Sequence, residues 1–171
     1  MKNDNFFFIG MPGVGKTTLG KMLAQQTQHT FIDTDHFLME RMGVDIPTIF
    51  ALEGEDGFRK REAAVIEELT GRNKIILATG GGAVINPVNR SLLSKRGTVI
   101  YLEATAETLL ERIRPHKDRP LLQVDNPLEK LKSLIIERTP FYREIADYTI
   151  SIDKQSCNQL LQTLLPIVGK K

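Results

Sequence analysis

Eight residues near the N-terminus, Gly10 to Thr17, match the pattern G-x-x-x-x-G-K-[ST] at every fixed position. Glycines let such a loop fold tightly, so that its backbone N–H groups point at phosphate oxygens. In this pattern the lysine, here Lys16, reaches the β- and γ-phosphates of a nucleotide, and the hydroxyl of Thr17 binds Mg²⁺. The segment follows an apolar run and precedes a helical pattern, which is the context that the motif requires. These residues therefore predict a nucleotide-phosphate site.

Two carboxylates follow the next apolar run, Thr30 to Ile32. Asp33 and Asp35 are separated by one residue, so at a strand end both would lie on one side. Ligands of open parallel sheets bind beyond the carboxyl ends of the strands. One carboxylate could hold Mg²⁺, directly or through water, and the other could orient or deprotonate a substrate hydroxyl. Alternatively, Asp35 could simply cap the next helix, because Asp is a favoured N-cap residue.

Three consecutive glycines, Gly80 to Gly82, follow the apolar run Lys74 to Ala78. This strand end should lie near the phosphate-binding loop, where residues without side chains let backbone amides approach a ligand closely. A flexible turn between a strand and a helix is the alternative, but such a turn needs one or two glycines rather than three.

Four arginines are candidates for binding an anionic group. Arg138 falls on the apolar stripe of its predicted helix, where a guanidinium needs an anionic partner, and Arg59 could be braced by Glu62 one turn away. Both could bind a carboxylate bidentately. Arg119 could move onto a transferring phosphate, and Arg112 could stack on an adenine. Each arginine could instead lie on the surface.

The rest of the chain must position these residues. Short runs rich in β-branched or aromatic residues predict five strands separated by helical patterns, which is typical of a parallel sheet covered on both faces. Asparagine–proline pairs predict helix starts after Asn86 and Asn126. The predicted strands span 6–9, 30–32, 74–78, 98–102 and 148–152.

The chain length fits one domain, residues 1–171. Residues 35–62 contain two helical pieces before the next strand, which predicts an insertion. Residues 113–125 are polar and contain two prolines, which predicts a mobile loop that acts as a lid.

Composition excludes several classes of partner. Charged residues make up 26% of the chain with a net charge of only +2, so no concentrated basic surface indicates nucleic acid or a membrane as partner. Cys157 is the only cysteine, which favours a reducing compartment. The apolar run Phe6 to Ile9 is too short for a signal-peptide core or a membrane span. We expect a cytoplasmic monomer.

The order of the motifs resembles the shikimate kinase family over most of the chain. After the phosphate-binding loop come a D-x-D pair, F-R-x-x-E, G-G-G, R-P-L-L and R-x-P-x-Y. They lie at Asp33–Asp35, Phe58–Glu62, Gly80–Gly82, Arg119–Leu122 and Arg138–Tyr142. The phosphate-binding loop alone is unspecific, but this combination in this order is highly specific.

The resemblance implies a P-loop NTPase fold of the nucleoside-monophosphate-kinase type, with three layers and five parallel strands. It also implies transfer of the ATP γ-phosphate to the 3-hydroxyl of shikimate, on the route to chorismate and the aromatic amino acids. Mg²⁺ would be held by Thr17 and Asp33, and catalysis would use Lys16, Asp35 and Arg119. Shikimate would contact Asp35, Arg59, Gly81 and Arg138. ATP would contact Gly13, Val14, Gly15, Lys16, Thr17, Thr18, Arg112, Arg119 and Gln155.

Three alternatives stay open from the residues alone. A related small-molecule kinase, acting on gluconate or a nucleotide, would share the phosphate site. A GTPase switch would be expected to carry an N-K-x-D motif, which the sequence lacks. An inactive P-loop scaffold is disfavoured because Lys16, Thr17, Asp33 and Asp35 are all present.

Overall fold

The computed structural model describes residues 2–116 and 123–169. Its five strands agree with the predicted ones to within one residue at each end. They are β1 (Phe6–Ile9), β2 (Thr30–Asp33), β3 (Ile75–Ala78), β4 (Thr98–Glu103) and β5 (Tyr148–Ser151). All neighbouring strands are parallel, in the order β2-β3-β1-β4-β5. The expected five-stranded parallel sheet is confirmed.

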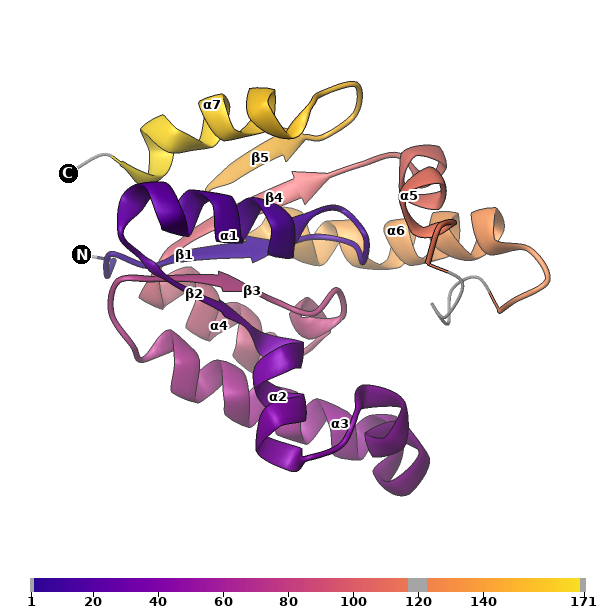
Figure 1. The fold of residues 1–171 in the computed structure, drawn as a ribbon. Helices are drawn as coiled ribbons and strands as arrows, with labels where there is room; N and C mark the ends of the chain where they lie inside the picture. The colour runs from indigo at the N-terminus through magenta and orange to yellow at the C-terminus, as the bar shows by residue number, and fades with distance from the viewer. Residues whose placement is uncertain (1, 117–122, 170–171) are drawn as a thin grey trace.

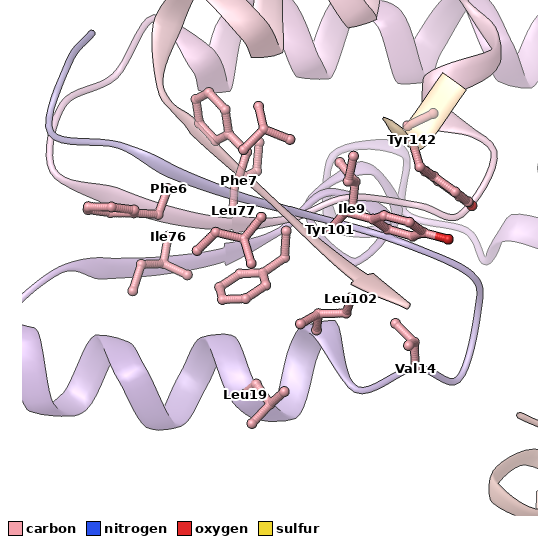
Figure 2. Packing of buried hydrophobic residues seen from close by; sticks show 14 of the residues in the cluster. Phe6, Phe7, Ile9, Val14, Leu19, Ile76, Leu77, Tyr101, Leu102 and Tyr142 are labelled. Atoms are coloured by element: carbon pink, nitrogen blue, oxygen red, sulfur yellow. The ribbon is translucent and has the colours of Figure 1, made fainter. Parts of the chain in front are cut away.

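The apolar strand β1 lies at the centre of this sheet. Its four residues are all buried, because helices cover both faces and leave no face of the strand to water. Phe7, Ile9 and Leu77 belong to the buried cluster shown in Figure 2. At the far end of the cluster the rings of Tyr101 and Tyr142 stack, with their centroids 4.9 Å apart. The core therefore extends from the sheet into the helix that carries Tyr142.

Helices form a layer on each side of the sheet (Figure 1). One layer consists of α1 (Lys16–Thr27) and α7 (Cys157–Val168), which contact each other. The opposite layer contains α3 (Ile46–Thr70), α4 (Pro87–Arg96) and α6 (Pro127–Ile145). The helix α5 (Ala106–Ile113) packs on α6, and a short 3₁₀ helix η1 (Ala83–Ile85) precedes α4. The three-layer α/β fold is confirmed.

The two asparagine–proline pairs begin helices as predicted. The side chain of Asn86 accepts from the N–H of Val88 at the start of α4, and that of Asn126 accepts from Glu129 at the start of α6. Proline follows each cap at the first helical position, where its missing N–H costs no hydrogen bond.

Residues 35–62 contain two helical pieces, as predicted. The first is α2 (Thr34–Met42), and the second is the beginning of α3, which packs on α2 and continues to Thr70. Gly54, with φ of 71°, kinks α3. Figure 1 shows α2 and the start of α3 projecting from one end of the sheet. The exact bounds of an insertion and the single-domain organisation stay predictions.

The predicted lid, residues 113–125, spans the gap between α5 and α6. Residues 117–122, which include Arg119, lie outside the described residues, so the lid also stays a prediction. Over residues 2–116 and 123–169, the helices are too short or too polar to cross a membrane.

Candidate active site

The phosphate-binding loop connects β1 to α1 at the carboxyl edge of the sheet. Gly13 and Gly15 have positive φ values of 84° and 105°, which residues with side chains rarely adopt. Gly15 is the N-cap of α1 and supplies no side-chain cap, so the first turn of the helix presents its N–H groups to the loop. A helix start of this kind, with the positive end of its dipole, binds phosphate.

Lys16 is held at the mouth of this loop. Its ammonium group donates to the carbonyl of Gly10 at 2.5 Å and to that of Met11 at 2.9 Å. The residue is only 8% exposed, so its charge lies inside the site rather than in solvent. This location suits a cation that serves phosphate oxygens.

Thr17 and Asp33 meet across the loop. The Thr17 hydroxyl donates to Oδ2 of Asp33 at 2.6 Å, and Oδ1 of Asp33 accepts from the backbone N–H of His36 at 3.0 Å. Asp33 is thus both the last residue of β2 and the N-cap of α2. A hydroxyl and a carboxylate oxygen side by side are ligands that Mg²⁺ prefers. Among the described residues no three His, Cys, Asp or Glu side chains form a metal cluster, but Mg²⁺ needs few protein ligands because it keeps several waters.

Asp33 and Asp35 line the same cleft at the end of β2, as expected, but they are not neighbours on one face of a strand. The helix begins at Thr34, directly after the strand, so Asp35 lies in the first turn of α2. The N-cap that the sequence suggested for Asp35 belongs to Asp33, because its side chain can reach the N–H of His36 at the helix start. Asp33 therefore faces Thr17, while Asp35 comes from a different element and faces the glycine segment.

Asp35 is partly buried between charged groups. Burial raises the pKa of its carboxyl, and the neighbouring Asp33 carboxylate raises it further, while Lys16 and Arg59 act in the opposite direction. A carboxylate with a raised pKa accepts a proton more readily than an exposed one. Asp35 is thus suited to take a proton from a hydroxyl bound beside it.

Arg59 and Glu62 form an ion pair within α3, as the sequence suggested. The guanidinium donates to Oε1 of Glu62 at 2.9 Å, and a weaker contact of 3.7 Å joins it to exposed Glu55. The Glu62 side chain is 2% exposed, and its other oxygen, Oε2, has no hydrogen-bond partner among the described residues. Burial raises the pKa of Glu62, while Arg59 opposes that shift.

Each glycine of the segment Gly80–Gly82 faces a different neighbour. A Cβ on Gly80 would lie 3.0 Å from Oε2 of Glu62 and 3.1 Å from Oδ1 of Asp35. A Cβ on Gly81 would lie 2.6 Å from Cδ of Pro12, and one on Gly82 would lie 2.4 Å from the Arg59 guanidinium. A side chain at Gly81 would clash with the P-loop, and side chains at Gly80 and Gly82 would crowd Asp35 and the Arg59–Glu62 pair, so the glycines fit close packing and not only a turn.

Side chains from three helices anchor this segment. Tyr142 of α6 donates to the carbonyl of Gly81 at 2.6 Å, and Thr34 of α2 accepts from the N–H of Gly80 at 3.1 Å. Asn89 of α4 donates to the carbonyl of Ala83, the residue after the glycines, at 3.0 Å. The N–H groups of Gly81 and Gly82 have no acceptor among the described residues. Two backbone donors of the glycine segment thus lack a partner in the described part of the chain.

Sequence reasoning assigned no function to Tyr142, Thr34 or Asn89. In the sequence, Tyr142 is only the last residue of the R-x-P-x-Y motif. The signal that could have found it is the polar tip of an aromatic residue at a fully buried position, since such a tip needs a hydrogen-bond partner.

Arg138 lies beside Tyr142, one helical turn earlier on α6, and its charge also acts on Glu62. Its Nε is buried and has no hydrogen-bond partner among the described residues. No carboxylate of that part of the chain forms an ion pair with it. A guanidinium at a core-facing position needs an anionic partner, and no described carboxylate supplies one for Arg138. Its guanidinium is therefore available for an anionic ligand.

Arg112 and Gln155 occupy different environments. The Nη1 of Arg112 approaches the carbonyl of Val14 at 3.4 Å and lies against Gly15, so this side chain borders the P-loop. Gln155 donates to the carbonyl of Ser151 at 2.6 Å, in the connection between β5 and α7. No described contact joins Gln155 to the P-loop.

A cleft of about 930 Å³ at this edge of the sheet joins most of these groups. Its walls include the P-loop, both aspartates, two of the glycines and Arg112; Arg59, Arg138 and Gln155 are not on them. The predicted site residues on its walls are Gly13, Gly15, Lys16, Thr17, Thr18, Asp33, Asp35, Gly81 and Arg112. Arg59 adjoins this wall through its contact with Gly82. The phosphate-binding loop and the carboxylates of Asp33 and Asp35 thus face one space, and the Arg59–Glu62 pair lies beside its glycine wall. This is an arrangement for phosphoryl transfer to a polar acceptor.

Comparison with known proteins agrees with this geometry. The sequence model of the family described as "Shikimate kinase" matches residues 12–168. The shikimate kinase of Cupriavidus pinatubonensis is 52% identical over 161 residues, which cover 94% of this chain and 84% of that protein. The shikimate kinase of Vibrio campbellii is 52% identical over 164 residues, covering 94% and 95% of the two chains.

Solved structures give the same result. The shikimate kinase of Acinetobacter baumannii in complex with shikimate superposes with a TM-score of 0.91 and 44% identity, covering 98% of this chain and 93% of that one. The Aquifex aeolicus shikimate kinase gives a TM-score of 0.84 at 30% identity, covering 96% of each chain. A gluconokinase of Sinorhizobium meliloti reaches a TM-score of 0.59 at 15% identity, covering 99% and 94% of the two chains, a likeness of fold alone.

Proposed function

This chain belongs to the shikimate kinase family, and on that premise we propose that it transfers the γ-phosphate of ATP to the 3-hydroxyl of shikimate. The products are shikimate 3-phosphate and ADP, on the route to chorismate and the aromatic amino acids. One observation supports this most strongly. The P-loop packs directly on the glycine segment, where Gly81 meets Pro12, and the other side of that segment meets Asp35, Arg59 and Glu62.

The P-loop side binds the nucleotide. The N–H groups at the start of α1 and the Lys16 ammonium receive the phosphates. Val14, Thr18, Arg112 and Gln155 contribute the rest of the nucleotide site, with Arg112 and Gln155 beside the adenine. The contact of Arg112 with the P-loop supports its assignment to the nucleotide site, whereas the assignment of Gln155 rests on the family resemblance.

Thr17 and Asp33 would hold Mg²⁺, Asp33 through a water. Their contact at 2.6 Å places a hydroxyl oxygen and a carboxylate oxygen at one point beside the phosphate site, which fits the donor preference of this ion. Bound there, Mg²⁺ would neutralise charge on the β- and γ-phosphates. The second oxygen of Asp33 is occupied by the start of α2, which fixes the orientation of the carboxylate.

The acceptor side binds shikimate. Arg59, held by Glu62, and Arg138, whose buried Nε has no partner among the described residues, bind the shikimate carboxylate. Gly81 contributes a backbone N–H at the same place. Asp35 contacts the ring hydroxyls, and its raised pKa suits it to accept the proton of the 3-hydroxyl as the new bond to phosphorus forms.

Charge develops on the phosphoryl group during transfer, and cations stabilise it. Lys16 supplies one such cation from the P-loop. Arg119, which lies outside the described residues, supplies a second from the lid; this role rests on the family resemblance. We also infer a monomer in the cytoplasm.

A coupled assay of ADP release with Mg-ATP tests the function. Wild-type protein should turn over shikimate and leave gluconate and nucleoside monophosphates unreacted. Phosphorus NMR of the product should show a monoester on the 3-hydroxyl. Turnover of gluconate or of a nucleotide at a comparable kcat/KM would contradict the proposal and favour a related small-molecule kinase.

A further inference from the structure

The peptide that joins Gly81 to Gly82 is held by a side chain that sequence reasoning left without a function. Tyr142 is fully buried, its ring stacks on Tyr101, and its hydroxyl donates to the Gly81 carbonyl at 2.6 Å. Figure 2 shows the two tyrosine rings at the edge of the core, with the Tyr142 hydroxyl at the tip of the ring. Burial raises the pKa of this hydroxyl, so it keeps its proton at neutral pH and remains a donor.

A fixed carbonyl also fixes the N–H on the other side of the same peptide. The described peptide bonds are all trans, so the Gly82 N–H points opposite to the Gly81 carbonyl. The preceding peptide is fixed differently, because the Gly80 carbonyl accepts from the N–H of Ala83 at 3.1 Å. The orientation of the Gly81 N–H is therefore set by the turn itself, and that of the Gly82 N–H is set by Tyr142.

The surroundings of Gly82 indicate what this donor serves. Gly82 lies against Arg59: a Cβ added to this glycine would be 2.4 Å from the Arg59 guanidinium. Arg138 lies beside the Tyr142 phenol. Two cations and two backbone donors without an acceptor among the described residues thus surround one short stretch of backbone, which is suited to a carboxylate.

We propose that Tyr142 is a positioning residue for shikimate: by holding the Gly81 carbonyl it orients the Gly82 N–H as a further donor to the bound acid. This inference rests on the proposed function and adds one positioning residue to it, Tyr142. Tyr142 does not touch the substrate. It sets the affinity for shikimate through the glycine segment, while the nucleotide binds on the P-loop side.

Tyr142→Phe tests this, since it removes the hydroxyl and keeps the stacked ring. Calorimetry should show a loss of shikimate affinity of about five- to tenfold, the effect of one neutral hydrogen bond. The shikimate KM should rise equally, while kcat and the ATP KM change less than about twofold. Tyr101→Phe is the matched control, because it deletes a hydroxyl from the other ring of the stack; it should leave shikimate affinity unchanged.

Several outcomes would overturn the inference. Shikimate affinity of Tyr142→Phe within twofold of wild type would show that the hydroxyl has no positioning function. An equal loss of shikimate and nucleotide affinity would show a general loosening of the fold. A wild-type protein that does not phosphorylate shikimate would overturn the proposed function itself, and this inference with it.

A measurement on the wild-type protein keeps the test valid even if the variant does not fold. In ¹⁵N-labelled protein, shikimate should shift the amide resonances of both Gly81 and Gly82, as new hydrogen bonds to these groups form. An unshifted Gly82 amide at saturating shikimate would overturn the inference.

Discussion

The guanidinium of Arg59 donates to Glu62 across 2.9 Å, and the two residues differ sharply in exposure. The Glu62 side chain is 2% exposed, whereas that of Arg59 is 22% exposed. The carboxylate therefore lies inside the protein and the cation lies at the surface of the site, where its remaining N–H groups can receive an anion. The buried Glu62 carboxylate therefore holds the Arg59 guanidinium in one orientation.

Glu62→Ala should both destabilise the protein and weaken shikimate binding. The loss of stability should be smaller than the loss of about 3–5 kcal/mol for a fully buried ion pair, because Arg59 is partly exposed, and Arg59 would lose its orientation. Thermal unfolding and shikimate titration measure the two effects. Glu53→Ala is the control on the same helix, because its pair with Arg61 lies in solvent and should contribute little. Equal effects of the two variants would contradict the function given to Glu62.

Lys16→Ala should lower kcat/KM by at least about a hundredfold, because an electrostatic contact to the transferring group is lost. Near-UV circular dichroism should show an intact fold. Lys21→Ala is the control, since this exposed lysine of the same helix also borders the cleft; its kcat/KM should stay within about twofold. If Lys16→Ala retained more than a few per cent of the wild-type kcat/KM, the assignment of Lys16 to the transferring phosphate would be wrong.

Asp35→Asn should abolish turnover and stabilise the protein at neutral pH. The folded pKa of Asp35 lies above the ordinary value of 3.8, so the folded state binds its proton more tightly than the unfolded state. The carboxylate therefore costs stability as pH rises from 3.8 through the folded pKa. The Tm gain of Asp35→Asn should be present at pH 7 and vanish near pH 3. A Tm that falls at pH 7 would show that Lys16 and Arg59 outweigh burial.

Arg138→Ala should weaken shikimate binding by about 2–5 kcal/mol, the range for truncating one partner of a buried charge pair. Arg138→Lys should also bind poorly, because an ammonium cannot replace the two-pronged guanidinium. Calorimetric titration of ATP should show little change in either variant. Arg143→Ala is the control, since this arginine of the same helix is exposed and pairs with Glu103. Unchanged shikimate affinity in Arg138→Ala would make Arg138 a structural residue.

Alanine at Gly81 and at Gly82 should have different effects. A Cβ on Gly81 meets the ring and backbone of Pro12 in the P-loop, so the affinities for both ATP and shikimate should fall. A Cβ on Gly82 meets only the end of the Arg59 side chain, so the shikimate KM should rise with little change in the ATP KM. Steady-state kinetics in both substrates distinguishes the two patterns, and identical patterns would contradict the packing described.

The sequence alone determined the local features of this protein. The P-loop, the five strands and the helix starts at Asn86 and Asn126 depend on residues that lie next to one another in the chain. Turns, caps and apolar periodicity act over a few residues, so their signals are complete in the sequence. The expected substrate, shikimate, came from the family resemblance, because the combination of motifs in this order is specific to that family.

Tertiary structure decided which distant residues meet. Only the strand order, with β3 between β1 and β2, brings the glycine segment beside both the P-loop and α2. Asp33 rather than Asp35 caps α2, because the helix begins at Thr34, directly after the strand. The bond from Tyr142 to Gly81 spans 61 residues of sequence. No local signal encodes such a contact, because a buried hydroxyl specifies only that it needs a partner, and the packing of helices on the sheet selects which carbonyl it reaches.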